Sequence, residues 1–376
     1  MENHIIPLRT LQYRCTTMKT KHVDYRSMIP LAGIGVALLI TVIMWLAVPA
    51  TANASSDKTI SPDTVIASWP VTANPIKTAD QAMDVLMSSR RLNASALTIG
   101  QVKHYLDEQA SRGELDPAHK LVKARLLQLR HDFDEASTLL QDVITSPSHS
   151  ANAQLLLATI QTQMGQFSQA RDTCSELFGK VALIVTFTCT MDADFQSSPS
   201  RATYSRLASL TSTRASAPQA QMDWINETLA SMALQVGEPR LARGHLQNIE
   251  LSTAPVSLVA LWMDTHIAQD NPEAVLTGIE PLIDNTNSVD DAILLRLAIA
   301  EVQTGTGKMW QQKMQQRVKV REWRGDSEHA AQLARYYLDV VTDKDKAIQF
   351  ASLHYEHSKT AKDAALLARA TAVSDK

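Results

Sequence analysis

Hydrophobic positions follow two different patterns along the chain. Residues 29–48 form an apolar run without a charged side chain, and a helix of about 20 such residues is long enough to cross the hydrocarbon core of a bilayer. A polar segment with three prolines follows at residues 55–77. From residue 78 onward, apolar residues recur at the spacing of one helix face. The pattern predicts an all-α protein, with one N-terminal hydrophobic helix and then a long helical region, residues 78–376.

The charges that precede the apolar run predict its orientation. Residues 1–28 carry five Lys or Arg side chains against two acidic ones, a net charge of 5 - 2 = +3. Basic flanks stay on the cytoplasmic side of the membrane. We therefore expect a cytoplasmic leader at residues 1–28 and the remainder of the chain outside the cytoplasm of a bacterium.

Two fates of residues 29–54 remain open. Pro49 interrupts the helix, and Ala52 with Ala54 match the small residues that signal peptidase requires, which favours a signal peptide cleaved after Ala54. An uncleaved helix would instead anchor the protein to the membrane through residues 29–48. Both interpretations place the C-terminal region in the cell envelope, either in the periplasm or attached to the cytoplasmic membrane.

A short pattern recurs after 34 residues. Residues 129–136 (LRHDFDEA) and 163–170 (QMGQFSQA) share an aromatic residue followed three positions later by alanine. Matching small and large positions flank the two segments: Ala124 and Ala158 before them, Leu140 and Cys174 after them. Together these residues resemble the tetratricopeptide repeat (TPR). The resemblance implies one pair of antiparallel helices per repeat, joined by a short turn.

Later turns keep this arrangement with other residues. The equivalent positions Ala242, Val275, Trp310 and Ala347 are separated by 33, 35 and 37 residues. A more degenerate helix pair is expected at residues 180–212, with its turn at residues 198–200. We therefore expect a TPR-like α-solenoid of about eight antiparallel helix pairs that share one core, followed by a last helix at residues 360–372.

The resemblance also implies a binding surface. TPR proteins generally bind peptides or extended partners in the concave groove that the first helix of every pair lines. By the pattern of the family, the groove-facing positions include Leu121, Arg125, Gln128, Leu155, Thr159 and Thr162. The Lys and Asn set with which chaperone-type members hold a terminal carboxylate is not present, which disfavours that class of partner.

The amino-acid composition argues against several classes of function. The chain has 376 residues, with 36 Lys and Arg against 39 Asp and Glu and a formal net charge of -3, a balance that argues against a nucleic-acid-binding protein. Only 12 Gly and 14 Pro are present, which favours long helices over many short strands. Three cysteines are too few for a disulfide-rich scaffold or a four-cysteine zinc site.

Cys174 and Cys189 are the two cysteines of the predicted exported region. They fall in helices that are expected to pack against each other, so an oxidising compartment could join them in a disulfide. The alternative is two buried thiols that act as small apolar residues. The sequence leaves both open.

Sequence motifs that would support catalysis are incomplete. The Gly305-Thr-Gly307-Lys308 segment lacks the first glycine of a phosphate-binding loop, and Met309 replaces the residue that would bind magnesium. His354 and His357 are three residues apart, whereas the zinc protease motif requires two histidines four apart. We therefore predict no enzyme activity, no cofactor and no bound metal.

Residues 308–324 form a basic amphipathic segment. Trp310, Met314 and Val318 repeat every four residues, and the basic side chains lie elsewhere. Such a helix can bind a membrane surface or an acidic partner. The alternative is a helix whose apolar stripe is buried in the core while its charges face water.

These features favour a scaffold or adaptor that is exported or membrane-anchored and binds another protein or peptide in the bacterial cell envelope. The alternative is an envelope hydrolase or transferase with an unrecognised active site in the groove. Scattered histidines such as His119, His131, His245 and His266 are the titratable residues that this alternative offers.

Overall fold

The computed structural model describes residues 75–94, 97–212, 217–325 and 328–372. The predicted leader, the apolar helix with its cleavage site, and most of the linker lie outside this part of the chain. The chain divides into two units, Met1–Pro75 and Ile76–Lys376, and the fold below is that of the second. Within the described ranges, no helix combines the length and hydrophobicity that a membrane span requires.

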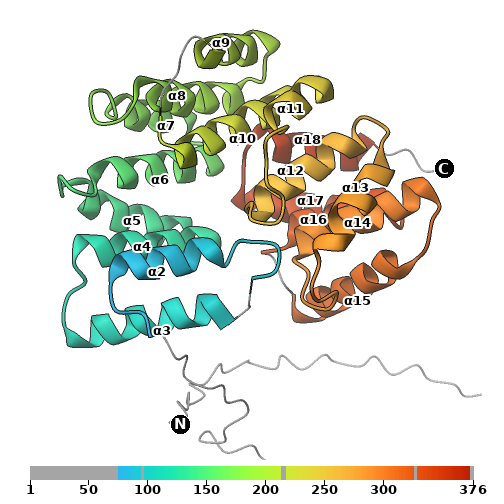
Figure 1. Ribbon diagram of the computed structural model, residues 1–376, viewed down its shortest axis with the longest axis horizontal. Helices are drawn as coiled ribbons and strands as arrows, with labels where there is room; N and C mark the ends of the chain where they lie inside the picture. The colour runs from blue at the N-terminus through green and yellow to red at the C-terminus, as the bar shows by residue number, and fades with distance from the viewer. Residues whose placement is uncertain (1–74, 95–96, 213–216, 326–327, 373–376) are drawn as a thin grey trace, which may run out of the picture. The chain divides into compact units, whose positions relative to one another are not determined.

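The described residues are all-helical, as the hydrophobic pattern predicts (Figure 1). They form 17 α-helices and one 3-10 turn, without a β-strand. The elements are α2 (Ala79–Ser88), α3 (Leu97–Arg112), α4 (Pro117–Leu129), α5 (Phe133–Ile144), α6 (Ser150–Gln163), α7 (Phe167–Ser175), α8 (Leu183–Ser197), α9 (Arg201–Ser212), α10 (Gln219–Gln235), α11 (Pro239–His245), α12 (Val256–Ile267), α13 (Pro272–Ile279), η1 (Glu280–Leu282), α14 (Asp291–Thr304), α15 (Met309–Arg324), α16 (Ala330–Asp339), α17 (Lys344–His357) and α18 (Ala361–Ala372).

Neighbouring helices pack in pairs, and the same order of contacts repeats along the chain. Each even-numbered helix from α2 to α16 packs against the helix that follows it. Each also packs against the next even-numbered helix, from α2 on α4 to α16 on α18. Every pair therefore buries its apolar face between itself and its neighbours.

Five of the turns inside these pairs share one backbone conformation. A residue with positive φ lies two or three positions after the first helix of the pair: His131, Gly165, Gly237, Asp270 and Thr342, with φ between 55° and 77°. In four of these turns, the main-chain N–H of the residue after the positive-φ residue donates to the carbonyl oxygen five positions before that donor. One example is the bond from Gln166 to Gln161 at 2.8 Å. This bond satisfies a carbonyl that the helix end leaves without a partner. Only two of the five residues are glycine, which alone adopts this conformation without steric cost.

The repeated alanines explain how the paired helices approach each other. Ala136, Ala170, Ala242 and Ala347 occupy equivalent positions in α5, α7, α11 and α17, and each is fully buried. In these four pairs a larger side chain would push the two helices apart, whereas α13 and α15 bury Val275 and Trp310 at the equivalent positions. The 34-residue pattern in the sequence therefore reports helix packing.

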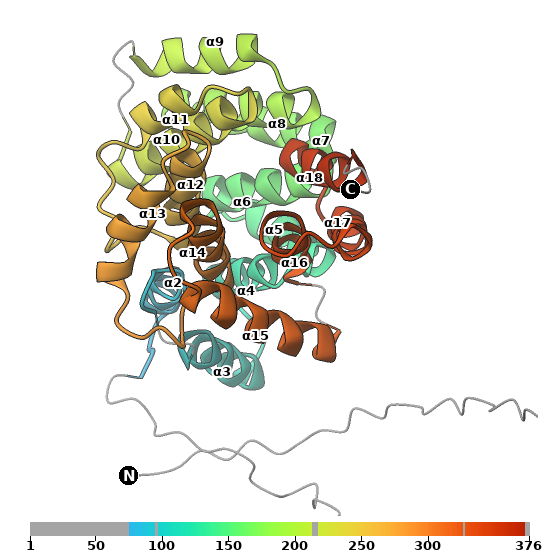
Figure 2. The same cartoon turned by 90° about the vertical axis from the view of Figure 1, so that its right-hand side faces the viewer.

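The C-terminal helices return to the middle of the unit (Figure 2). The Lys359 N–H donates to the Gln163 carbonyl oxygen at 2.7 Å, and the Ala361 N–H donates to Gln196 Oε1 at 3.1 Å. These bonds join the α17–α18 turn to α6 and α8, and α18 itself packs against α8. The end of the helical array is thus fixed to its middle.

A second return contact involves the segment that follows α2. The Val256 N–H donates to the Arg90 carbonyl oxygen at 2.6 Å, and Arg91 pairs with Pro255 in an isolated β-bridge. Asn93 Nδ2 donates to the Leu282 carbonyl oxygen at 2.7 Å. The first helix pair of the unit is therefore attached to the segments around α12 and η1.

Candidate functional site

Four of the six predicted groove positions do not offer free side-chain groups to a partner. Leu121 is buried in one hydrophobic cluster, and Leu155, which is partly buried, packs against two other clusters. The Thr162 hydroxyl is buried and donates to the Ala158 carbonyl oxygen at 2.9 Å. Thr159 is exposed, but its hydroxyl donates to the Leu155 carbonyl oxygen. Of the six predicted positions, two are thus buried (Leu121 and Thr162), three are partly buried and Thr159 is exposed.

The remaining two positions, Arg125 and Gln128, interact with each other on α4. Arg125 is partly buried, and its Nη1 donates to Gln128 Oε1 at a long 3.4 Å. Burial lowers the pKa of the Arg125 guanidinium to about 10, and the positive charge of Arg90 contributes to this shift. Arg90 lies just after α2, which packs on α4. Two positive side chains therefore share a partly desolvated environment.

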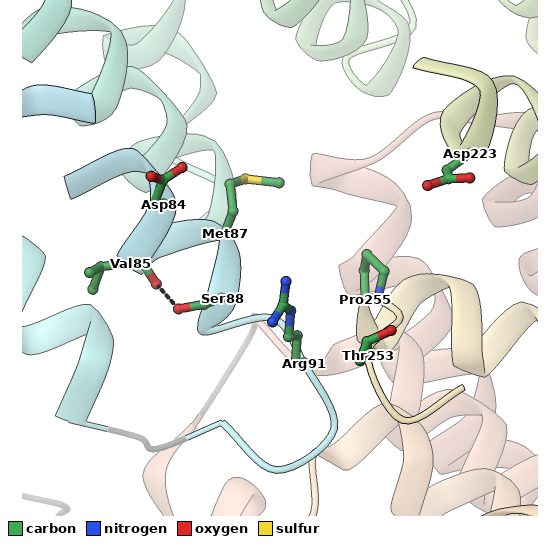
Figure 3. Close-up of a pocket in the computed structure, with 8 residues that line it drawn as sticks. All are labelled: Asp84, Val85, Met87, Ser88, Arg91, Asp223, Thr253 and Pro255. Carbon is green, nitrogen blue, oxygen red and sulfur yellow. Dashed lines mark hydrogen bonds between the residues drawn. The ribbon is translucent and has the colours of Figure 1, made fainter. Parts of the chain in front are cut away.

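An open cleft of about 690 Å³ adjoins the segment that carries Arg90 (Figure 3). Its lining residues come from α2, from the segment after α2, from α10 and from the segment before α12: Asp84, Val85, Met87, Ser88, Arg91, Asp223, Thr253 and Pro255. The β-bridge between Arg91 and Pro255 holds two of these walls together.

The charged side chains of the cleft are not neutralised by the fold. Arg91, Asp84 and Asp223 are exposed, and none of them forms an ion pair with another described residue. Asp223 accepts a hydrogen bond from Gln219 Nε2 at 2.8 Å. Arg91 and the two carboxylates therefore present opposite charges within one cleft. Such a cleft suits a ligand that carries both positively and negatively charged groups.

Other partly buried arginines are paired with carboxylates and belong to the framework. Asp264 on α12 accepts from Arg296 Nη2 at 2.5 Å and from Arg335 Nη1 at 3.0 Å. Burial alone would raise the pKa of Asp264, but the charges of Arg296 and Arg335 outweigh it and lower the pKa. This cluster joins α12, α14 and α16.

A second paired cluster fixes the basic helix α15. Asp291, which is buried at the start of α14, accepts from Arg317 and from Arg321 Nε, the latter at 3.0 Å. The stripe of Trp310, Met314 and Val318 is buried. Of the two interpretations of residues 308–324, the structure supports a packed helix, although Trp323 at its end is 84% exposed.

Cys174 and Cys189 are joined by a disulfide with an S–S distance of 1.97 Å. The bond links α7 to α8, and both residues are buried. It therefore cross-links two consecutive helix pairs.

The two sequence segments with partial motifs have structural partners. The Gln311 N–H, at the start of α15, donates to Glu301 Oε2 at 3.0 Å, so a protein carboxylate already occupies the helix start after Gly307. His354 Nε2 donates to Asp363 Oδ1 at 3.0 Å. Among the described residues, no group of three or more potential ligands has the arrangement that a metal ion requires.

Arg90 and Arg91 are the residues that sequence analysis missed. They form a basic pair at the end of the first predicted helix, but a surface location would explain such a pair equally well. Only the packing of α2 on α4 brings Arg90 close to Arg125. No protein-family model matches this chain, and no curated protein matches its sequence.

Proposed function

We propose that this protein is a TPR-like α-solenoid that serves as an adaptor in the bacterial cell envelope and binds another protein or peptide. Two regularities support the repeat interpretation. Every even-numbered helix packs on the next one, and the turn residues His131 and Gly165 share a left-handed backbone 34 positions apart. Repeat arrays of this kind bind partners through surfaces built by several repeats.

The observation that carries the binding role is the cleft beside α2. Arg91, Asp84 and Asp223 line it without forming ion pairs among the described residues. Because its lining comes from helix pairs far apart in the sequence, the cleft depends on the complete array. A polypeptide segment that carries charged side chains and main-chain amide groups could pair with both the positive and the negative side chains of the cleft.

Export is supported by the sequence and by the cysteines. The basic leader and the apolar run at residues 29–48 are typical of a signal peptide or anchor. The Cys174–Cys189 disulfide fits an oxidising compartment such as the periplasm. N-terminal sequencing of the mature protein from envelope fractions would distinguish cleavage after Ala54 from an uncleaved anchor.

Photocrosslinking in intact cells tests the adaptor role. A photoreactive amino acid would replace Met87, which lines the cleft and is 37% exposed. The matched control is Met309, which is 45% exposed at the start of α15, outside the cleft. We expect a discrete adduct from position 87, identified by mass spectrometry, that position 309 does not form. The same adducts from both positions, or none from position 87, would contradict a partner site in the cleft.

A further inference from the structure

The outward face of α15 is the side of this helix that the fold leaves exposed, at the edge of the helical unit (Figure 2). By the 3.6-residue period, six exposed residues lie on this side, opposite the buried stripe: Met309, Gln312, Gln316, Lys319, Val320 and Trp323. Trp323 is 84% exposed, the largest value among the large hydrophobic residues that the structure describes. Met309 and Val320 are 45% and 43% exposed. Packing of α15 against α14 therefore leaves a second apolar surface in contact with solvent.

The charges around this face are basic. Lys319 lies on the outward face, Lys308 precedes the helix and Arg324 ends it, and all three are exposed. None of them forms an ion pair with another described residue. Glu322, the one acidic residue of α15, is partly buried and pairs with Lys346 at 2.9 Å. The outward face therefore combines exposed apolar side chains with unpaired positive charges.

This combination matches the surface of a lipid bilayer that contains anionic phospholipids. A tryptophan ring is apolar but carries one N–H donor, and it is enriched at the level of the lipid headgroups. Lys and Arg side chains extend along apolar surface and place their charges near lipid phosphates. Two acidic residues, Asp326 and Glu328, follow the helix in the sequence and oppose this attraction. Charge alone is therefore insufficient, and the contact also requires Trp323.

We propose that the outward face of α15 binds the surface of an anionic phospholipid membrane, with Trp323 among the headgroups and Lys319 and Arg324 beside the phosphates. The inference goes beyond the adaptor function, because no residue of α15 lines the cleft. The predicted apolar run at residues 29–48 would keep an uncleaved chain close to lipid, so that even a weak contact is populated.

The test uses the full chain in liposomes of phosphatidylcholine with about one quarter phosphatidylglycerol, which supplies the anionic surface. An environment-sensitive dye is attached to V320C, next to an intact Trp323, in a C15S background that removes the remaining thiol. Nitroxide-labelled lipids quench the dye where it touches the bilayer. The control is the same dye at L183C, because Leu183 is 50% exposed on α8. We expect quenching at position 320 and none at position 183. Quenching at neither position, or equal quenching at both, would overturn the proposal.

Substitutions on the labelled chain show which side chains hold the lipid. K319Q and R324Q should each lower the ratio of lipid-bound to free dye, resolved from fluorescence lifetimes, by about fivefold. Neither should change this ratio in liposomes of phosphatidylcholine alone. The charge control is R240Q, on an exposed arginine of α11, which should stay within about twofold of the unmodified protein. An equal effect of R240Q would mean that net charge, and not the outward face, governs the contact.

Replacement of Trp323 tests the apolar part of the contact. W323S should abolish quenching at position 320, and W323F should retain most of it. Because Trp323 is 84% exposed, both variants should unfold at the same urea concentration as the unmodified protein, which excludes misfolding as the cause.

A protein that covers this face would give a different signal. If the dye at position 320 moved to a less polar environment as the protein concentration rose, without quenching by nitroxide-labelled lipids, a second copy of the chain would be the occupant. That result would overturn the membrane proposal and leave the cleft and its adaptor role unaffected.

Discussion

The main-chain N–H of Lys359 donates to the carbonyl oxygen of Gln163 at 2.7 Å, and this bond fixes the α17–α18 turn to the end of α6. Gly165 lies at the same contact with a φ of 77°. A Cβ atom built at position 165 would lie 3.0 Å from Lys359 Cβ. The left-handed turn and the return of the C-terminal helices therefore meet at one glycine.

We expect the G165A variant to be destabilised for two reasons. Alanine in the left-handed region costs about 1 kcal/mol or more, and the added methyl group would also displace Lys359. G179A isolates the first effect, because Gly179 has a φ of 76° and open space around its Cα. Urea unfolding should show a larger loss for G165A than for G179A. Equal losses would mean that the added methyl group does not displace Lys359 at a measurable cost.

Replacing Thr342 with glycine should raise the free energy of unfolding. Thr342 has a φ of 63°, which is unfavourable for a β-branched residue. Relief of this strain should exceed the added chain entropy of glycine and yield a gain of about 0.5–1 kcal/mol. T145G is the control, because Thr145 has a φ of -70° and glycine there should only destabilise. Chemical denaturation of both variants measures whether the free energy of unfolding rises for T342G and falls for T145G.

Arg125 and Arg296 should respond to neutral replacement in opposite directions. R125M removes a partly buried charge that forms no ion pair with a described residue, so we expect a gain of about 1 kcal/mol. R296M leaves Asp264 with one fewer guanidinium partner and should cost about 3 kcal/mol. Thermal unfolding of the two variants at low salt provides the comparison. A destabilised R125M would argue that the fold itself requires this charge.

Asp363 should make the stability of the C-terminal helices depend on acid pH. Burial alone would raise its pKa, but the hydrogen bond from His354 and the positive charge of Lys362 hold the pKa well below 3.8. Because the folded-state pKa is depressed, the stabilisation is complete above about pH 4 and is lost as the pH falls below the unfolded-state value.

The D363N variant tests this titration. It should lose at least about 1.4 kcal/mol at neutral pH, the equivalent of one pKa unit. The difference from the unmodified protein should shrink as the pH falls below 3.8, the ordinary value for this carboxyl. D80N, at an exposed position on α2, serves as the control. A constant difference across acid pH would contradict the titration of Asp363 as its cause.

Local features of the fold were accessible from the sequence because they repeat. Phe133 with Ala136 and Phe167 with Ala170 begin α5 and α7, where the alanine must be small for paired helices to touch. The helix pair at residues 183–212, with its turn at Ser198 to Ser200, also lies where the spacing predicts it. These features depend on residues close together in the chain.

Features that join distant parts of the chain were not accessible. The Lys359–Gln163 bond uses main-chain atoms, which carry no sequence signal. Leu121 was expected to face a groove, but α2 and α6 pack on α4 and leave it buried. The proximity of Arg90 to Arg125 likewise depends on how α2 is placed on α4. None of the residues that line the cleft was among the predicted groove positions.

The attachment of the last helices to α6 and α8 has a consequence for how the array comes apart. In an open stack of repeats, terminal units can fray while the middle stays folded, because each touches only its immediate neighbours. Here the final hairpin shares its hydrogen bonds with residues 163 and 196. Because separation of this hairpin would break its bonds to α6 and α8, we expect it to unfold together with those helices and not to fray alone.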